Sequence, residues 1–185
     1  MALMYLPLYL FLLGICSAFL WLPALGVGIG LLVLRPSCRR KLGVLFGLWG
    51  LSMVLLLGTA WAESNVSVRL RNWVYTVPVY FWGAVSIVLL IAVAWYAMRQ
   101  MDRRWKKRLL EVGAALSVWA VVSWGFLLLV FTARPETVGE WRGQKVVMQE
   151  LSWMETTYSY YAYNGPFLLG ESLGWSEEPW GEDLG

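Results

Sequence analysis

The stretch RQMDRRWKKR, residues 99–108, lies between two long runs that contain almost no charged side chains. A second basic cluster, RPSCRRK at residues 35–41, also separates two apolar runs. Together the two clusters hold ten of the twelve Lys and Arg residues that precede position 132. Multi-pass membrane proteins concentrate basic residues in short segments on the cytoplasmic side of the bilayer. The pattern therefore predicts an integral membrane protein with both clusters facing the cytoplasm.

The composition supports the membrane class. Hydrophobic residues make up 59% of the 185 residues, above the ~45–50% of an ordinary soluble domain. Residues 1–131 carry 12 basic and 3 acidic side chains (net +9), whereas residues 132–185 carry 3 basic and 9 acidic ones (net −6). Basic segments suit an anionic membrane surface, and no nucleic-acid-binding pattern accompanies them. We therefore expect no nucleic acid partner.

Four apolar runs are long enough to cross a hydrocarbon core of ~30 Å as helices. They occupy residues 3–34, 42–62, 74–98 and 109–131. The first run is longer than a span requires, so we expect a tilted helix that bends at Pro23. Pro78 suits the first turn of the third helix. The prediction is a four-transmembrane-helix bundle over residues 1–131, with the N-terminus and the C-terminus both extracytoplasmic.

The composition changes after Arg134-Pro135, which ends the last helix. Residues 144–150, 152–163 and 167–169 are strand-like, and Arg142-Gly143 and Asn164-Gly165 are turn signals. Residues 132–185 are therefore predicted to form a small external antiparallel β meander with an irregular tail from residue 171. The outer loop, 63–72, alternates like a short strand, and we expect its Arg69 and Arg71 to face Glu side chains of this appendage.

The residue types exclude much catalytic chemistry. The chain contains no histidine, which excludes Ser-His-Asp and Cys-His nucleophile activation and imidazole-bound zinc. Cys16 and Cys38 lie in an apolar run and at the reducing face, so no disulfide is expected. The tail carboxylates lack the spacing of a calcium loop and suit a solvated tail: Glu177, Glu178, Glu182 and Asp183. We expect no catalytic residue, cofactor or metal site.

Ionisable side chains in the middle of a span usually mark transport or proton relay. The only carboxylate within a predicted span is Glu111, three residues after Arg108, where we expect an interfacial ion pair. A protein that binds apolar cargo is not excluded by this argument. The tryptophans within spans suit bundle packing or, alternatively, a site that stacks a lipid or quinone-like ring: Trp49, Trp82, Trp119 and Trp124.

Small residues one turn apart let helices approach closely in lipid. The pairs are Gly14 and Ala18, Gly26 and Gly30, Gly43 and Gly47, and Gly113 and Ser117. They suit contacts within the bundle or contacts with a partner subunit. Outside the spans, aromatic residues suit a cover for a thin sheet, a rest on lipid headgroups, or a face that stacks on a sugar or peptide: Trp153, Tyr158, Tyr160, Tyr161 and Tyr163.

The stretch YSYYAYNGPFLLG, residues 158–170, resembles the end of small four-span membrane proteins of Gram-positive bacteria that have a short Tyr-rich external C-terminal segment. In those proteins a Tyr-Tyr-x-Tyr strand, a turn, a Phe and a Gly follow the last membrane helix, and the four-span layout is similar. The resemblance implies a bacterial plasma membrane. It implies no activity and no site residue.

These observations predict a non-catalytic accessory or interaction protein of the bacterial cell membrane. Its partners would be membrane lipids and a membrane protein bound through the Gly-rich helix faces or the external segment. The alternative is a transporter component, or a membrane protein that binds a lipid or other apolar ligand. An intramembrane enzyme is disfavoured because the chain lacks the constellation of His, Cys or carboxylate groups that such chemistry uses.

Overall fold

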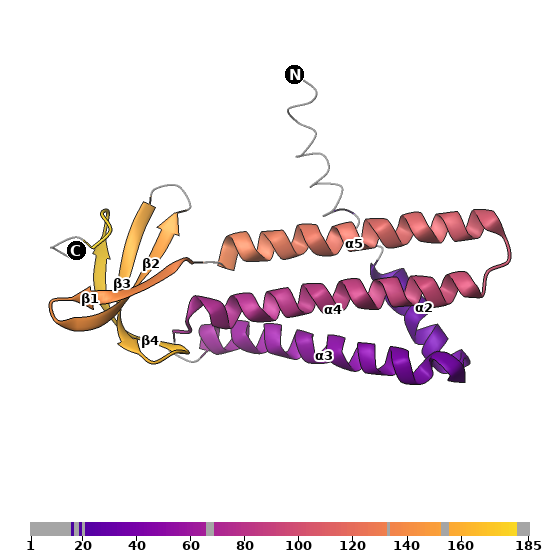
Figure 1. Ribbon diagram of the computed structural model, residues 1–185, viewed down its shortest axis with the longest axis horizontal. Helices are drawn as coiled ribbons and strands as arrows, with labels where there is room; N and C mark the ends of the chain where they lie inside the picture. The colour runs from indigo at the N-terminus through magenta and orange to yellow at the C-terminus, as the bar shows by residue number, and fades with distance from the viewer. Residues whose placement is uncertain are drawn as a thin grey trace, which may run out of the picture. The chain divides into compact units, whose positions relative to one another are not determined.

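The computed structural model describes Cys16, Phe19 and residues 21–65, 69–132, 134–152 and 156–180 (Figure 1). The protein is mainly helical, with a small antiparallel sheet. The chain divides into two compact units. Unit 1 consists of Met1–Leu55 and Val79–Leu129, and unit 2 consists of Leu56–Pro78 and Val130–Gly185. Three helices contribute to both units, so the chain passes between the units within helices.

Four helices occur in the described part of the chain: α2 (Trp21–Leu34), α3 (Pro36–Asn65), α4 (Asn72–Arg99) and α5 (Arg104–Thr132). Three of them contain segments long and apolar enough to cross a membrane, namely Cys38–Ala62, Asn72–Arg99 and Arg104–Phe131. The helices predicted at 42–62, 74–98 and 109–131 are therefore confirmed. Arg134-Pro135 follows α5 as predicted, because proline cannot continue a helix.

The structure describes only the second half of the predicted first span as a helix. Helix α2 has 14 residues, or ~21 Å at 1.5 Å per residue, less than a hydrocarbon core of ~30 Å. Pro23 is the third residue of α2 and lies in the first turn of that helix, where a proline breaks no helical hydrogen bond. The rest of residues 3–34 lies outside the described residues, apart from Cys16 and Phe19.

The two basic clusters lie mostly within helices. Pro36 begins α3, so Arg39 and Arg40 belong to its first turns, and Arg104 begins α5. Figure 1 shows the junction between α2 and α3 and the connection between α4 and α5 at the same end of the helices. Cations at a helix N-terminus oppose the helix dipole by ~0.3–1 kcal/mol each. Anions near these helix ends would offset this cost.

Helix α4 is the central element of unit 1. Half of its most apolar segment is buried (50%), against 11% for α3 and 22% for α5. The core cluster joins α2, α3 and α4 through Leu31, Cys38, Leu42, Leu89, Val93 and Ala97. Gly28 lies where a Cβ atom would be 2.7 Å from Cζ of Phe46 and 3.1 Å from Cγ2 of Val93. The absence of a side chain at residue 28 therefore lets α2 pack against α3 and α4.

Unit 2 contains a four-stranded antiparallel meander in the order β1-β2-β3-β4. The strands are β1 (Glu136–Trp141), β2 (Gln144–Ser152), β3 (Thr156–Asn164) and β4 (Leu168–Ser176). The prediction of three strands is wrong in number. It missed β1, which contains charged residues and a glycine, and it ended the last strand too early. Residues 171–176, predicted to be irregular, belong to β4.

The predicted turns are confirmed. Arg142 and Gly143 have φ angles of 49° and 76°, as a two-residue hairpin turn requires, and they join β1 to β2. Gly165, with a φ of 90°, follows Asn164 at the end of β3. At both positions the turn needs a left-handed backbone, which glycine adopts without a steric cost.

The sheet buries side chains on both faces, because a strand alternates its residues between faces. One face buries Val146, Met148 and Tyr160, with Trp180 packed against them. The other face buries Val147, Tyr161 and Leu169, with Tyr163 alongside. Tyr160 and Tyr161, which are neighbours in β3, therefore pack on opposite faces of the sheet.

Candidate functional site

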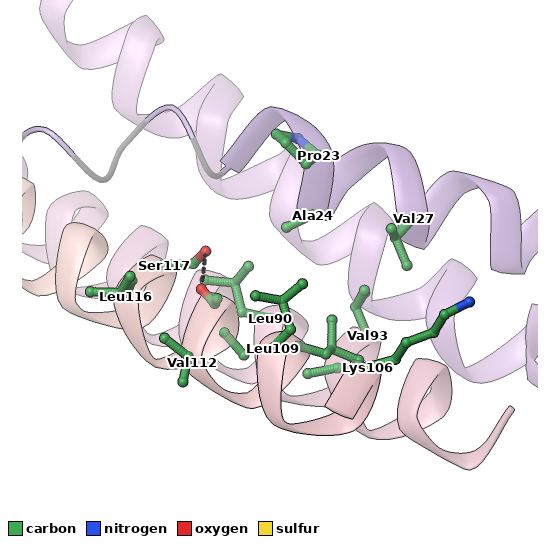
Figure 2. A pocket seen from close by; sticks show the side chains of 14 residues that line it. Pro23, Ala24, Val27, Leu90, Val93, Lys106, Leu109, Val112, Leu116 and Ser117 are labelled. Carbon is green, nitrogen blue, oxygen red and sulfur yellow. Dashed lines mark hydrogen bonds between the residues drawn. The ribbon is translucent and has the colours of Figure 1, made fainter. Parts of the chain in front are cut away.

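An apolar cavity of about 470 Å³ lies between α2, α4 and α5, inside unit 1. Figure 2 shows side chains from the three helices converging on it. Helix α2 contributes Pro23, Ala24 and Val27, and α4 contributes Leu90, Val93 and Ala94. Helix α5 provides the longest wall, which runs from Lys106 to Ser117. The cavity lies within the ~300–1,000 Å³ of typical small-molecule sites.

Small residues create this space. Ala24 faces it from α2, Ala94 from α4, and Gly113 and Ala114 from α5. A Cβ atom at Gly113 would meet no described atom within 4 Å. The hydroxyl of Ser117 donates a hydrogen bond to the carbonyl oxygen of Gly113 at 2.8 Å, within its own helix (Figure 2). The hydroxyl of Ser117 is therefore already hydrogen-bonded and needs no polar partner from a bound molecule.

Lys106 lines one end of the cavity. Its aliphatic chain runs beside the apolar residues, and its ammonium group extends beyond them (Figure 2). The Nζ atom lies 5.8 Å from the ring centroid of Trp105, which is exposed. Long basic side chains bury the stem in apolar surroundings and keep the charge in water. The cavity thus has an apolar body and a cationic end.

The four tryptophans that were candidates for a ligand site do not line this cavity. The ring of Trp21 stacks on Trp49, with centroids 5.9 Å apart, and on Trp82, at 6.4 Å. Trp119 and Trp124 are exposed on α5. Trp49 and Trp82 therefore pack within unit 1, which was one of their two predicted roles, whereas the role of Trp119 and Trp124 stays a prediction.

Three buried polar atoms in this part of unit 1 have no hydrogen-bond partner among the described residues: Nε1 of Trp49, Nε1 of Trp82 and Oγ of Ser86. Ser86 lies one helical turn after Trp82 on α4. By contrast, Ser52 Oγ donates to the carbonyl oxygen of Trp49 at 2.7 Å. An unsatisfied buried donor costs roughly 1–3 kcal/mol. These unpartnered groups therefore lower the stability of unit 1.

The predicted close contacts through small residues are absent at the glycines of these pairs that the structure describes. A Cβ atom at Gly26, Gly30, Gly43 or Gly47 would meet nothing within 4 Å among the described residues. Gly113 lines the cavity, and a Cβ atom there would likewise meet nothing within 4 Å among the described residues. Gly14 and Ala18 lie outside the described residues. The alternative of contacts with a partner subunit stays a prediction.

In unit 2, the connection between α3 and α4 joins the sheet as predicted. Leu70 forms an antiparallel bridge with Leu168 of β4. The N–H of Leu169 donates to the carbonyl oxygen of Arg69 at 2.8 Å, and the N–H of Arg71 donates to that of Phe167 at 3.0 Å. These bonds cover one end of the β4 edge.

Glu136 is the centre of a buried polar network. Its Oε2 accepts a hydrogen bond from Nε of Arg71 at 2.9 Å. Its Oε1 accepts from the backbone N–H of Asn72 at 2.6 Å and from Nε2 of Gln149 at 2.8 Å. The N–H of Arg134 donates to Oδ1 of Asn72 at 2.8 Å. A carboxylate at the N-terminus of α4 is favoured by the helix dipole.

Two details of this region differ from the predictions. Helix α4 begins at Asn72, whose backbone N–H donates to Glu136, so Pro78 is the seventh residue of the helix and does not lie in the first turn. Arg71 faces a glutamate as expected. Arg69 has no glutamate partner among the residues that the structure describes, and its guanidinium carbon lies 5.0 Å from the ring centroid of Tyr161. The aromatic surface of the sheet thus takes the place of the expected acidic partner.

The tyrosines of β3 do not form one stacking face. Tyr160 is buried on one face and Tyr161 on the other. The hydroxyl of Tyr160 accepts a hydrogen bond from the N–H of Trp180 at 2.8 Å and donates one to the carbonyl oxygen of Glu178 at 3.1 Å. The tyrosines therefore cover the sheet, which was one of the predicted roles. Trp153 lies outside the described residues.

The described residues contain no cluster of three or more His, Cys, Asp or Glu side chains that could hold a metal ion. Glu182 and Asp183 lie outside them. Cys16 and Cys38 form no disulfide, as expected. Glu111 is exposed on α5, and the expected ion pair with Arg108 does not occur in the described part of the chain.

Sequence reasoning missed the cavity, because its walls come from three helices that are separated in the chain. The small residues of α5 were the available signal, but they were interpreted as a helix contact. Comparisons of this chain with protein-family models, curated proteins and solved structures gave no significant match.

Proposed function

We propose that this protein is a non-catalytic, multi-pass protein of the bacterial cell membrane that holds a lipid or a similar apolar molecule between α2, α4 and α5. Support for the membrane comes from three long apolar helices whose surfaces are mostly apolar and exposed. Outside a bilayer, so much exposed apolar surface would cause aggregation. The bacterial assignment follows from the resemblance of residues 158–170.

The proposed orientation places both basic clusters in the cytoplasm and the sheet outside. The clusters lie at one end of the helices of unit 1 (Figure 1). Anionic lipids of the cytoplasmic leaflet attract such residues by ~1 kcal/mol each, which offsets the opposing helix dipole. The N-terminus would also be extracytoplasmic, although residues 1–15 lie outside the described residues.

Cysteine labelling tests the orientation. Cys16 and Cys38 are first replaced by alanine, and single cysteines are introduced at two exposed positions, Asp102→Cys and Glu177→Cys. In intact cells, a membrane-impermeant maleimide should label residue 177 and not residue 102. After permeabilisation it should label both. The reverse pattern in intact cells would overturn the orientation.

The ligand-holding function is carried by the cavity. The described part of its lining is apolar apart from Lys106 and Ser117, and the hydroxyl of Ser117 is hydrogen-bonded within its own helix. Concave sites of this size with mostly apolar walls suit apolar molecules. The alternative of an apolar-ligand protein, which the sequence left open, is thus the function that the geometry supports best.

Native mass spectrometry of the protein purified in mild detergent tests this function. The wild type should retain one lipid or comparable apolar molecule through detergent exchange. Gly113→Leu should fill the cavity and abolish this retention. Gly125→Leu is the matched control, since Gly125 is on the same helix, does not line the cavity and has space for a side chain. Equal retention by both variants would contradict the proposal.

A second candidate function, an accessory or interaction protein, is favoured by two aromatic residues of the sheet unit. Phe167 is 55% exposed and Trp175 is 51% exposed, and exposed aromatic side chains are frequent anchors of protein interfaces. A photo-crosslinking residue at position 175 should capture one stoichiometric membrane partner, whereas the same residue at exposed position 140 should not. A homogeneous monomer without any crosslinked partner would argue against this role.

A further inference from the structure

We propose that the occupant of the cavity is an anionic phospholipid from the leaflet that faces the basic clusters. One acyl chain would lie between α2, α4 and α5, and the phosphate would pair with Lys106. This inference rests on the proposed ligand-holding function and names the class of ligand. It is argued from the length of the cavity, its polarity and the charge at its end.

The length of the cavity matches one leaflet. Its wall on α5 extends from Lys106 to Ser117, which corresponds to ~16 Å of helix at 1.5 Å per residue. A leaflet contributes half of a hydrocarbon core of ~30 Å. A groove that starts at the basic end of the helix and continues for this distance suits an acyl chain that enters from that side and ends near the midplane.

The charged side chains near the Lys106 end of the cavity suit a phosphate group. Among the described residues that line the cavity, Lys106 is the charged one and none is a carboxylate. The segment 99–108 carries six basic side chains and one acidic side chain, Asp102. Several of these bases lie in the first turns of α5, where they repel one another and oppose the helix dipole. An anionic headgroup beside Lys106 relieves this repulsion, and a zwitterionic headgroup relieves it less.

The position of Lys106 relative to the interface fits the same occupant. The neighbouring Trp105 is exposed, and its ring lies 5.8 Å from Nζ of Lys106. Tryptophan favours the headgroup level of a bilayer. The ammonium group is therefore placed at the depth of lipid phosphates, while the stem of Lys106 continues the apolar wall (Figure 2).

The experiment uses the full-length protein in nanodiscs made from equal amounts of phosphatidylglycerol and phosphatidylethanolamine with identical acyl chains. After extraction into mild detergent, native mass spectrometry identifies the retained lipid. The wild type should retain phosphatidylglycerol in preference to phosphatidylethanolamine. Lys106→Gln should lower this preference about fivefold, the factor that corresponds to ~1 kcal/mol for one basic residue near the surface.

Lys107→Gln is the matched control. It removes the same charge one residue along α5, from a side chain that does not line the cavity, and should preserve most of the preference. Gly113→Leu should lose both lipids. If this variant is not monodisperse, Ser117→Leu, which fills the cavity from the next turn of the same wall, replaces it.

The outcomes separate the two proposals. Retention of both lipids without preference by the wild type, or equal effects of Lys106→Gln and Lys107→Gln, would overturn the assignment of an anionic headgroup and leave the ligand-holding function standing. If the wild type retains no lipid, or if cavity-filling variants retain as much as the wild type, the ligand-holding function itself is wrong. Preference for phosphatidylethanolamine would also overturn the inference.

Discussion

Nε of Arg71 lies 2.9 Å from Oε2 of Glu136, and this ion pair joins residues 65 positions apart in the chain. Glu136 is the first residue of β1, and Arg71 immediately precedes α4. The carboxylate is 7% exposed. Removing one partner of such a buried pair strongly destabilises the fold, because the remaining charge is then buried without compensation.

Glu136→Gln is expected to destabilise unit 2 by about 3 kcal/mol, because a neutral amide cannot accept all three hydrogen bonds that the carboxylate accepts. Limited proteolysis should show faster cleavage within residues 134–180. Glu140→Gln, at an exposed position of the same strand, is the control and should cleave at the wild-type rate. Equal cleavage rates for the two variants would show that the buried network does not hold the sheet.

Charge reversal at Arg71 should destabilise unit 2 more than charge reversal at Arg69, the other arginine of the connection between α3 and α4. Arg71→Glu should loosen unit 2 by about 3 kcal/mol, because it places a second carboxylate beside Glu136. Arg69→Glu should cost about 1 kcal/mol or less, since Arg69 is exposed and loses only its contact with the ring of Tyr161. Protease resistance of the same segment measures both. Unchanged resistance in Arg71→Glu would contradict the pairing of this connection with the sheet.

Gly139 and Trp180 should be energetically coupled. A Cβ atom at residue 139 would collide with the indole ring of Trp180. Gly139→Ala is therefore expected to lower the stability of the sheet by about 2 kcal/mol, as overpacking of a core does. In a Trp180→Ala background the same substitution should cost almost nothing. Additive losses in the double variant, measured by thermal unfolding, would refute the contact.

Ser86→Ala and Ser52→Ala form a matched pair. Both hydroxyls are fully buried (0% exposed), but Ser52 donates a hydrogen bond and Ser86 has no partner among the described residues. Ser86→Ala should raise the free energy of unfolding by about 1 kcal/mol, and Ser52→Ala should lower it by about 1 kcal/mol. The midpoint of thermal unfolding in detergent measures both changes. A loss of stability in Ser86→Ala would reveal a partner for this hydroxyl.

Gly28 and Gly26 test the packing of α2. Gly28→Leu should destabilise unit 1 by about 2–3 kcal/mol, because the added atoms meet the ring of Phe46 and the side chain of Val93. Gly26→Leu, two residues away on the same helix, has open space and should be close to neutral or slightly stabilising. Similar losses in the two variants would mean that α2 does not pack through Gly28.

The helices and turns were predictable because their signals are local. Apolar runs between basic clusters determine α3, α4 and α5, and most ends of these helices lie within a few residues of the predicted ones. The pair Arg142-Gly143 marks a turn because its left-handed backbone is available to glycine whatever lies around it. The role of Arg71 was predictable in part, since a basic residue in an otherwise acidic outer region has a limited choice of partners.

Other features were decided by the tertiary structure alone. The strand β1 has a weak local pattern, and it forms because β2 offers an edge and Glu136 is held by Arg71 and Asn72. The requirement for glycine at residue 139 arises from Trp180, which is far along the chain. The cavity exists because small residues of α5 face α2 and α4. Hydropathy and turn propensity act between near neighbours, whereas strand pairing, buried ion pairs and cavities depend on which distant residues meet.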